Sequence, residues 1–183
     1  RRCRRPRVAP SNPCHAQSMR TRDLTDIPGE CVMKAETISG YYAADHDRLD
    51  ELFARYRSLK ANEPMAARAT FDEFRSGLQR HIAWEEDILF PVFESYTGMR
   101  HSGPTAVMRA EHRQIEHCLD VIGKGLHEGD GATDDDDARL LSILESHNFK
   151  EEQVLYPAID HQVTTGERDE VFDRMARVPG PKD

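Results

Sequence analysis

The sequence predicts an all-α fold, an up-down-up-down four-helix bundle with a short extra C-terminal helix. Three observations predict it: long stretches with apolar residues at helical spacing, breaks containing Gly and Pro between them, and a composition of 32% charged and 7% aromatic residues. Short connections make neighbouring helices antiparallel, which gives the up-and-down order. The 183 residues are enough for one domain with a full hydrophobic core.

Each predicted helix is bounded by residues that favour a helix start or stop. The predicted helices cover about 36–60, about 65–96, about 104–127, from Thr133 through Leu155 and, as a short outer helix, about 166–176. Pro64 suits a first turn, and the hydroxyl of Thr133 can cap the fourth helix. Pro91 and Pro157 fall inside the second and fourth patterns, where each removes an N–H donor and either kinks or ends its helix.

The N-terminal residues differ from the rest of the chain. Residues 1–32 hold seven Arg against three acidic residues, are rich in Pro, and show no helical period. We expect them to be a disordered or non-native extension, followed by the helical domain at 33–178 and a tail at 179–183.

The charge of the chain limits its partners. The net charge is −8, and without the Arg-rich residues 1–32 the remainder is more acidic still. An acidic domain argues against nucleic acid as a partner, because phosphate contacts need Lys and Arg. No apolar run reaches about 18 residues, so we expect no membrane partner and a cytoplasmic location. The oligomeric state stays open.

A repeat with an offset of 66 residues brings the two halves of the chain into register. The segment 81–94 aligns with 147–160, where a His, a Glu pair, a Leu and a Pro coincide, and 45–46 aligns with 111–112. Each half therefore has a His and, 35 residues later, a second His followed four residues on by Glu. The residues paired in this way are His46, His81 and Glu85 in the first half and His112, His147 and Glu151 in the second.

The repeated pattern indicates a metal site. A single His-x-x-x-Glu pair is an ordinary pair of helix neighbours, but duplication of a plain helical hairpin would not favour His at these positions. Residues four apart share one helix face, so the two pairs can meet across the core. Glu85 and Glu151 are natural bridges between two cations. His with carboxylate suits iron or manganese, whereas copper(I) would prefer sulfur.

On these elements the chain resembles the hemerythrin family, specifically the bacterial hemerythrin-like (HHE cation-binding) domain, over about residues 36–162. The resemblance implies a four-helix bundle with a non-haem, oxo-type di-iron centre, so that two carboxylate-bridged iron ions are the expected cofactor. It implies that the ligands are His46, His81, His112 and His147, with Glu85 and Glu151 as bridges.

One position departs from the oxygen-carrying members of that family. Those members have a further His four residues after the third of these histidines, whereas this chain has Glu116, which we expect to be a seventh metal ligand. More carboxylate stabilises oxidised ions and argues against reversible oxygen transport.

Three further residues stay open as ligands. The carriers bridge with an Asp five residues after the last His; Glu152 has that spacing, but the repeat favours Glu151. Asp50 is the repeat partner of Glu116. Tyr42 lies one turn before His46, and core packing is favoured for it.

The expected function follows from the site. We expect a metal-binding protein, without a dedicated catalytic role, that binds or senses a small diatomic ligand (oxygen or nitric oxide) or peroxide, or handles iron. The alternative is a di-iron protein of iron–sulfur centre repair or redox stress defence, although such proteins carry an additional N-terminal cysteine-containing domain. A metal-free structural bundle is the third hypothesis.

Overall fold

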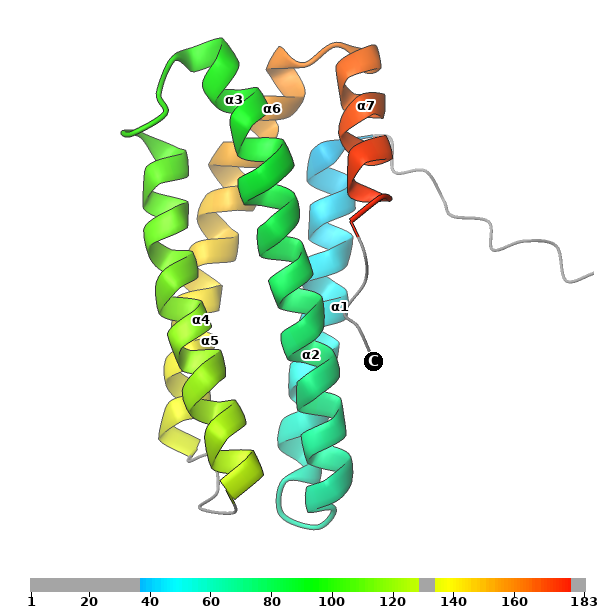
Figure 1. The fold of residues 1–183 in the computed structure, drawn as a ribbon, viewed down its shortest axis with the longest axis vertical. Coiled ribbons are helices and arrows are strands. Elements are labelled where there is room, and N and C mark those ends of the chain that lie inside the picture. The colour runs from blue at the N-terminus through cyan, green and yellow to red at the C-terminus, as the bar shows by residue number, and fades with distance from the viewer. Residues whose placement is uncertain (1–36, 129–133, 179–183) are drawn as a thin grey trace, which may run out of the picture. The chain divides into compact units, whose positions relative to one another are not determined.

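The computed structural model describes residues 37–128 and 134–178, and every regular element in these ranges is a helix (Figure 1). The predicted all-α class is therefore confirmed for this part of the chain. The expected extension at 1–32, the tail at 179–183 and the proposed cap Thr133 lie outside the described residues.

The elements form four long helical runs and one shorter helix. They are α1 (Ile38–Leu59), α2 (Pro64–Trp84), η1 (Glu85–Leu89), α3 (Phe90–Thr97), α4 (Pro104–Glu128), α5 (Asp134–Lys150), η2 (Glu151–Leu155), α6 (Tyr156–Gln162) and α7 (Thr165–Met175), where η marks a π-helical turn. The elements α2, η1 and α3 follow one another without a break, as do α5, η2 and α6. The bounds lie close to the predicted ones.

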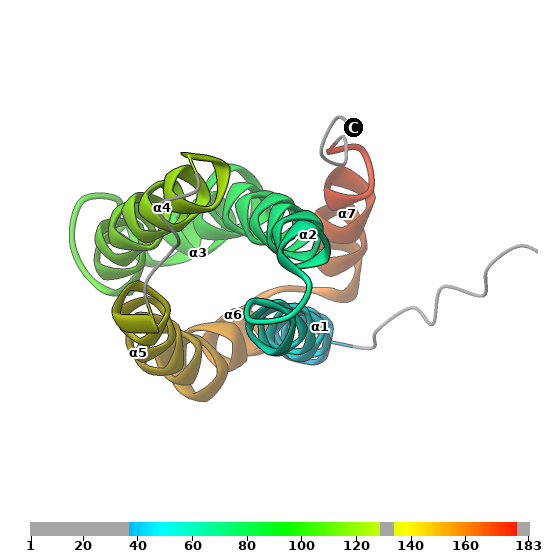
Figure 2. The ribbon, with the colours of Figure 1, turned by 90° about the horizontal axis from the view of Figure 1, so that it is seen from below.

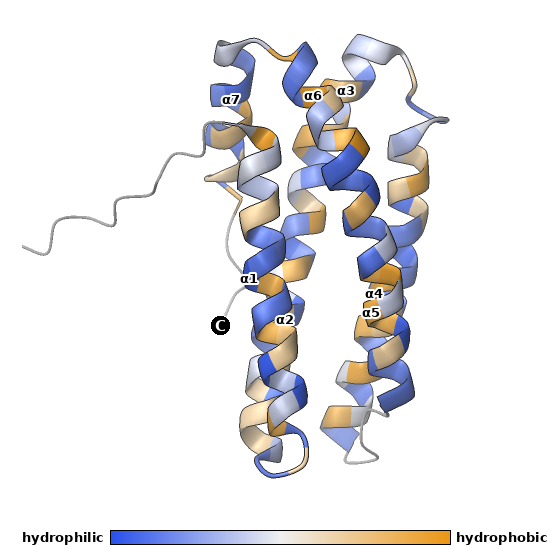
Figure 3. Cartoon of the chain, turned by 180° about the vertical axis from the view of Figure 1, so that it is seen from behind, coloured by the Kyte–Doolittle hydropathy of each residue, from blue (hydrophilic) through white to orange (hydrophobic). Residues whose placement is uncertain are grey.

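The four long runs lie side by side and surround a common interior (Figures 1 and 2). Helix α1 packs against α2 and α6, and α4 packs against α2 and α5. Helix α7 lies outside this arrangement and contacts η1. Hydrophobic and hydrophilic residues are mixed along each helix (Figure 3), as expected for helices that bury one face.

Two apolar clusters fill the interior, and a polar layer separates them. In α1, Tyr42 belongs to one cluster and Leu49 to the other. In α4, Met108 and Ile115 are divided in the same way. His46 and His112 lie between these pairs in sequence and are buried. The histidines are therefore held by tight packing on both sides along the helix axes.

The two prolines neither end their helices nor leave them regular. Each is preceded by a π-helical turn, Glu85–Leu89 before Pro91 and Glu151–Leu155 before Pro157. Pro91 cannot donate to the carbonyl of Asp87 four residues earlier, and Arg174 Nη2 of α7 donates to that carbonyl at 3.0 Å instead. Single π-helical turns inside α-helices are frequent at functional sites, and both of these begin at a predicted bridging glutamate.

The start of α5 is fixed by a buried ion pair at the opposite end from α7. Asp137 is fully buried and accepts hydrogen bonds from Lys60 Nζ at 2.6 Å and from the Tyr56 hydroxyl at 3.1 Å. These contacts connect α5 to α1 and to the residue after it.

In the described part of the chain, no helix is long and apolar enough to cross a membrane.

Candidate metal centre

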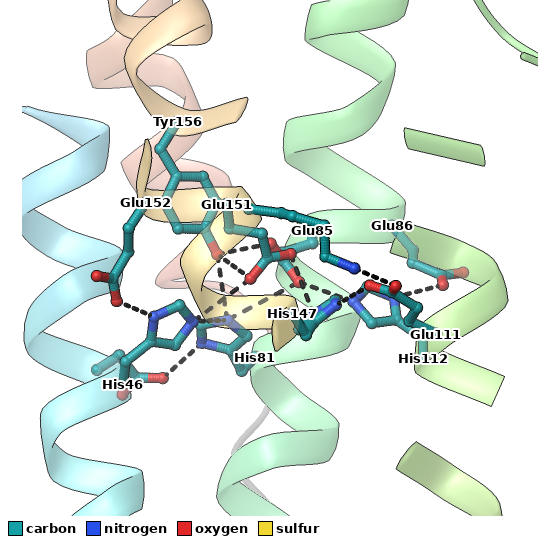
Figure 4. Close-up of polar contacts among 12 residues, drawn as sticks. His46, His81, Glu85, Glu86, Glu111, His112, His147, Glu151, Glu152 and Tyr156 are labelled. Carbon is teal, nitrogen blue, oxygen red and sulfur yellow. Dashed lines mark hydrogen bonds and ion pairs between the residues drawn. The ribbon is translucent and has the colours of Figure 1, made fainter. Parts of the chain in front are cut away.

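Six of the seven predicted ligands come together in the polar layer (Figure 4). Each is at most 4% exposed. They are His46 on α1, His81 on α2, Glu85 on η1, His112 on α4, His147 on α5 and Glu151 on η2. All four long runs therefore contribute to one cluster.

The six residues divide into two groups that share one glutamate. We call them position A, formed by Glu85, His112, His147 and Glu151, and position B, formed by His46, His81 and Glu151. Within each position every residue offers one ligand atom, and these atoms all lie within 4.8 Å of one another. Two neighbouring positions with a shared carboxylate are the arrangement that a pair of bridged cations requires.

In position B, the outward nitrogen of each histidine is held by a carboxylate. His46 Nδ1 lies 2.7 Å from Glu152 Oε1, and His81 Nδ1 lies 2.9 Å from Asp45 Oδ2. A carboxylate only accepts hydrogen bonds, so each Nδ1 carries the hydrogen and donates it. In the neutral ring, Nε2 then faces the site with a free electron pair.

Position A repeats this arrangement in the other half of the chain. His112 Nδ1 donates to Glu86 at 2.8 Å, and His147 Nδ1 donates to Glu111 at 3.0 Å. These two carboxylates are related to Glu152 and Asp45 by the 66-residue offset. We call Asp45, Glu86, Glu111 and Glu152 the outer carboxylates. The repeat thus includes the groups that orient the ligands as well as the ligands themselves.

The residues present fit a cation. Among the described residues, Glu85 Oε2, His112 Nε2 and Glu151 Oε1 are buried atoms without a hydrogen-bond partner. Unpaired polar atoms at the centre of a core are costly unless a cation or another partner satisfies them. His-and-carboxylate donor sets suit iron and manganese, and the described part of the cluster contains no thiolate.

Protons can neutralise these buried charges when no cation does. Burial raises the pKa of Glu151 to about 7, and the neighbouring Glu85 adds to this effect. Burial opposes the charge on His112 as well, but the carboxylates of Glu85 and Glu86 beside it raise its pKa to about 9. Burial also disfavours charge on Glu85, yet His112 and His81 hold its pKa below the usual range. Cation binding must therefore compete with protons.

Tyr156 belongs to the site, although sequence reasoning did not single it out. Its hydroxyl lies 2.8 Å from Glu85 Oε1 and 3.0 Å from Glu151 Oε2, so its single hydrogen is shared between these two acceptors, and it lies 3.5 Å from His81 Nε2. The signal that could have found it is its place in the repeat, where the equivalent residue is Phe90.

Glu116 is the one predicted ligand that the structure does not bring to the cluster. Its side chain is exposed, and neither metal position contains it. The buried stripe of α4 continues from His112 through Ile115 and Leu119, so the position four residues after His112 lies at the edge of that stripe. This placement does not support the expectation of a seventh ligand.

The three residues left open also have defined places. Asp50 is exposed, on α1. Tyr42 is fully buried, its hydroxyl lies 3.8 Å from the sulfur of Met175, and it packs in the core as favoured. Glu152 contacts His46 from outside the cluster and acts as an outer carboxylate.

Comparisons with known proteins agree with this geometry. The model of the Hemerythrin HHE cation binding domain matches residues 37–159. The iron-sulfur cluster repair protein YtfE of Edwardsiella ictaluri is 34% identical over 91 residues, which are 46% of this chain and 41% of that protein. YtfE of Yersinia pestis (strain Pestoides F) is 33% identical with the same coverage. This chain thus matches less than half of their length. No solved structure gives a significant match.

Proposed function

The chain belongs to the hemerythrin HHE cation-binding domain family, and on this premise we propose that it is a non-haem di-iron protein built on an up-down-up-down four-helix bundle. Position A and position B would each hold one iron ion. Glu151, which belongs to both positions, would bridge the ions, and the four histidines would bind through Nε2. The sequence repeat with Glu151 is the ground for proposing Glu85 as a second bridge. The six ligands, rather than the seven expected from the sequence, make up this proposed set.

One observation carries the proposal. Three buried atoms of the cluster, Glu85 Oε2, His112 Nε2 and Glu151 Oε1, have no hydrogen-bond partner among the described residues, while the opposite side of each histidine ring is held by an outer carboxylate. Glu85 Oε2 lies 3.1 Å from His112 Nε2 and Glu151 Oε1 lies 3.1 Å from His147 Nε2, so without a cation only shared protons can neutralise this buried cluster. A metal-free structural core would be expected to replace such a cluster with apolar groups. Their arrangement favours a cation-binding role over a structural one.

Iron bound in such a site supplies redox chemistry and affinity for small ligands such as oxygen and nitric oxide. The protein residues supply the environment. The rings of Tyr42 and Phe90 pack against His81 and His112, with ring centroids 5.1 Å and 5.8 Å apart. These apolar contacts keep water away from the ligands and strengthen the electrostatic interactions inside.

We therefore propose that the protein binds or senses a small diatomic ligand or peroxide, or handles iron. The resemblance to oxygen-carrying members stops at Glu116, where they have a histidine. This chain has Glu116 at the position of the fifth histidine of the carriers, and the side chain of Glu116 is exposed. This difference favours sensing, scavenging or iron handling over oxygen transport.

A second candidate is iron–sulfur centre repair or redox stress defence. The observation that favours it is the similarity to proteins named iron-sulfur cluster repair protein YtfE, at 34% and 33% identity. The two candidates predict different behaviour. A sensor or scavenger reacts with oxygen, nitric oxide or peroxide alone, whereas a repair protein restores the visible absorption of a nitric oxide-damaged iron–sulfur protein added to it.

The experiment that tests the shared di-iron proposal is anaerobic loading with ferrous iron, followed by metal analysis. We expect about two ions per chain, and fewer than two for Glu151→Gln, which keeps the shape of the side chain but removes its charge. Glu116→Gln is the matched control and should still bind two. No iron bound by a chain that remains helical would contradict the proposal, and an unchanged count in Glu151→Gln would contradict the ligand assignment.

A further inference from the structure

We propose that the two metal positions fill in a fixed order, A before B, and that Tyr156 sets this order. The inference rests on the proposed two-ion centre. It starts from a difference between the positions that their ligand types alone do not reveal: the glutamate oxygens facing position A contact only the histidines of that position, whereas the Glu151 oxygen on the side of position B already contacts the hydroxyl of Tyr156.

At position A the glutamate oxygens lie against the histidines of the same position. Glu85 Oε2 and His112 Nε2 lie 3.1 Å apart, and Glu151 Oε1 lies 3.1 Å from His147 Nε2. Three of these four atoms are among the buried atoms without a hydrogen-bond partner in the described residues. A first ion that binds here displaces protons and contacts among its own ligands, but no hydrogen bond to a residue outside the position.

At position B the corresponding atoms are occupied. The Tyr156 hydroxyl contacts the second oxygen of each glutamate, Glu85 Oε1 and Glu151 Oε2 (Figure 4). The Nε2 atoms of His46 and His81 lie 3.2 Å apart and both present electron pairs to the site, so the contact that an ion must displace here is the one made by Tyr156. An ion entering position B must therefore displace or rearrange contacts that already exist.

The sequence repeat isolates Tyr156 as the cause. The equivalent residue in the other half is Phe90, whose ring stacks on His112 at an interplanar angle of 8° and carries no hydroxyl. The ligands and outer carboxylates follow the repeat closely, but this ring does not. The phenol is thus a positioning group: it holds the glutamates toward position A and competes with the second ion for their oxygens.

The experiment is a titration of the metal-free full chain with ferrous iron under anaerobic conditions. Calorimetry measures the affinity of each step, and native mass spectrometry counts chains with zero, one and two ions. We expect two resolved steps, with the one-ion species dominating midway. In Tyr156→Phe the ratio of the two affinities should shrink by about tenfold or more, since a hydrogen bond to a charged group has about this effect.

Tyr42→Phe is the matched control. Tyr42 is also a buried phenol, its ring lies 4.7 Å from that of Tyr156, and its hydroxyl contacts the sulfur of Met175 instead of a carboxylate. This variant should keep the ratio of the wild-type protein. Circular dichroism confirms that both variants are folded before the titration.

Two histidine variants locate the steps. His46→Gln should keep the first step and weaken the second, whereas His112→Gln should lose the first. Two ions bound with equal affinity, a ratio unchanged or larger in Tyr156→Phe, or a first step lost in His46→Gln would overturn the order. Wild-type protein that takes up no iron would instead contradict the proposed di-iron function, so the two failures are distinguishable.

Discussion

Removing the metal should make the stability of this protein fall as the pH rises, because His112 then holds a proton at the centre of the site. The carboxylates of Glu85 and Glu86 raise the pKa of His112 from 6.5 to about 9 against the opposing effect of burial. A raised histidine pKa stabilises the fold fully below the unfolded value of 6.5, and this contribution is lost as the pH rises through 9.

The size of the effect follows from the pKa difference. Each tenfold change in proton affinity corresponds to about 1.4 kcal/mol, so His112 contributes about 3 kcal/mol that disappears between pH 6.5 and pH 9. Glu151 adds a separate loss at lower pH, between about 4.5 and 7, because burial raises its pKa to about 7 and its ionisation inside the core is unfavourable.

The assay is urea unfolding of chelator-treated protein, followed by circular dichroism at several pH values. The free energy of unfolding should fall by about 3 kcal/mol across the range, and bound iron should remove most of this dependence by replacing the proton. His112→Gln should flatten the profile of the metal-free protein, and the exposed His161→Gln should leave it unchanged. Stability that is constant or rises with pH in the metal-free wild-type protein would refute the pairing of His112 with these carboxylates.

Two further predictions concern residues around the site and away from it. Glu86→Gln removes the charged acceptor that orients His112, so the iron affinity should fall about 10- to 100-fold, as measured by competition with a chelator. An unchanged iron affinity would show that the contact between Glu86 and His112 does not support metal binding. Lys60→Met leaves Asp137 buried without its cation, so thermal unfolding should show that the free energy of unfolding falls by about 3 kcal/mol. The protein should still bind two iron ions, and a lower iron count would mean that this ion pair also shapes the metal centre.

Much of the fold could be predicted because its signals are local. The helical spacing of apolar residues, with Pro64 and Gly103 at the breaks, defined the helical runs, and Gly98 ends α3 in the left-handed conformation with φ of 70°. The π-helical turns could not be predicted as such. Pro91 and Pro157 indicated that each helix is interrupted, but the local sequence was compatible with either a kink or a helix end. Which of these forms depends on tertiary contacts, such as the hydrogen bond from Arg174 to the carbonyl of Asp87.

The ligands could be predicted because the repeat marks them twice. The same repeat contains the outer carboxylates as sequence neighbours of the ligands. Their role depends on contacts between helices, such as that of Glu152 with His46, which the spacing of residues along one helix does not predict. Glu116 was expected from a position in related proteins, and the rotation of the buried stripe on α4 places it in solvent. The repeat distinguishes Tyr156 from its equivalent Phe90, but only the direction of its hydroxyl in the structure shows that it reaches the two glutamates.

The most direct test of the di-iron centre is anomalous X-ray diffraction from iron-loaded crystals, recorded on both sides of the iron absorption edge. Two anomalous peaks are expected, one among Glu85, His112, His147 and Glu151 and the other among His46, His81 and Glu151. Peaks at other residues, or a cluster without an anomalous peak in crystals that contain iron, would contradict the assignment of this polar layer as the metal centre.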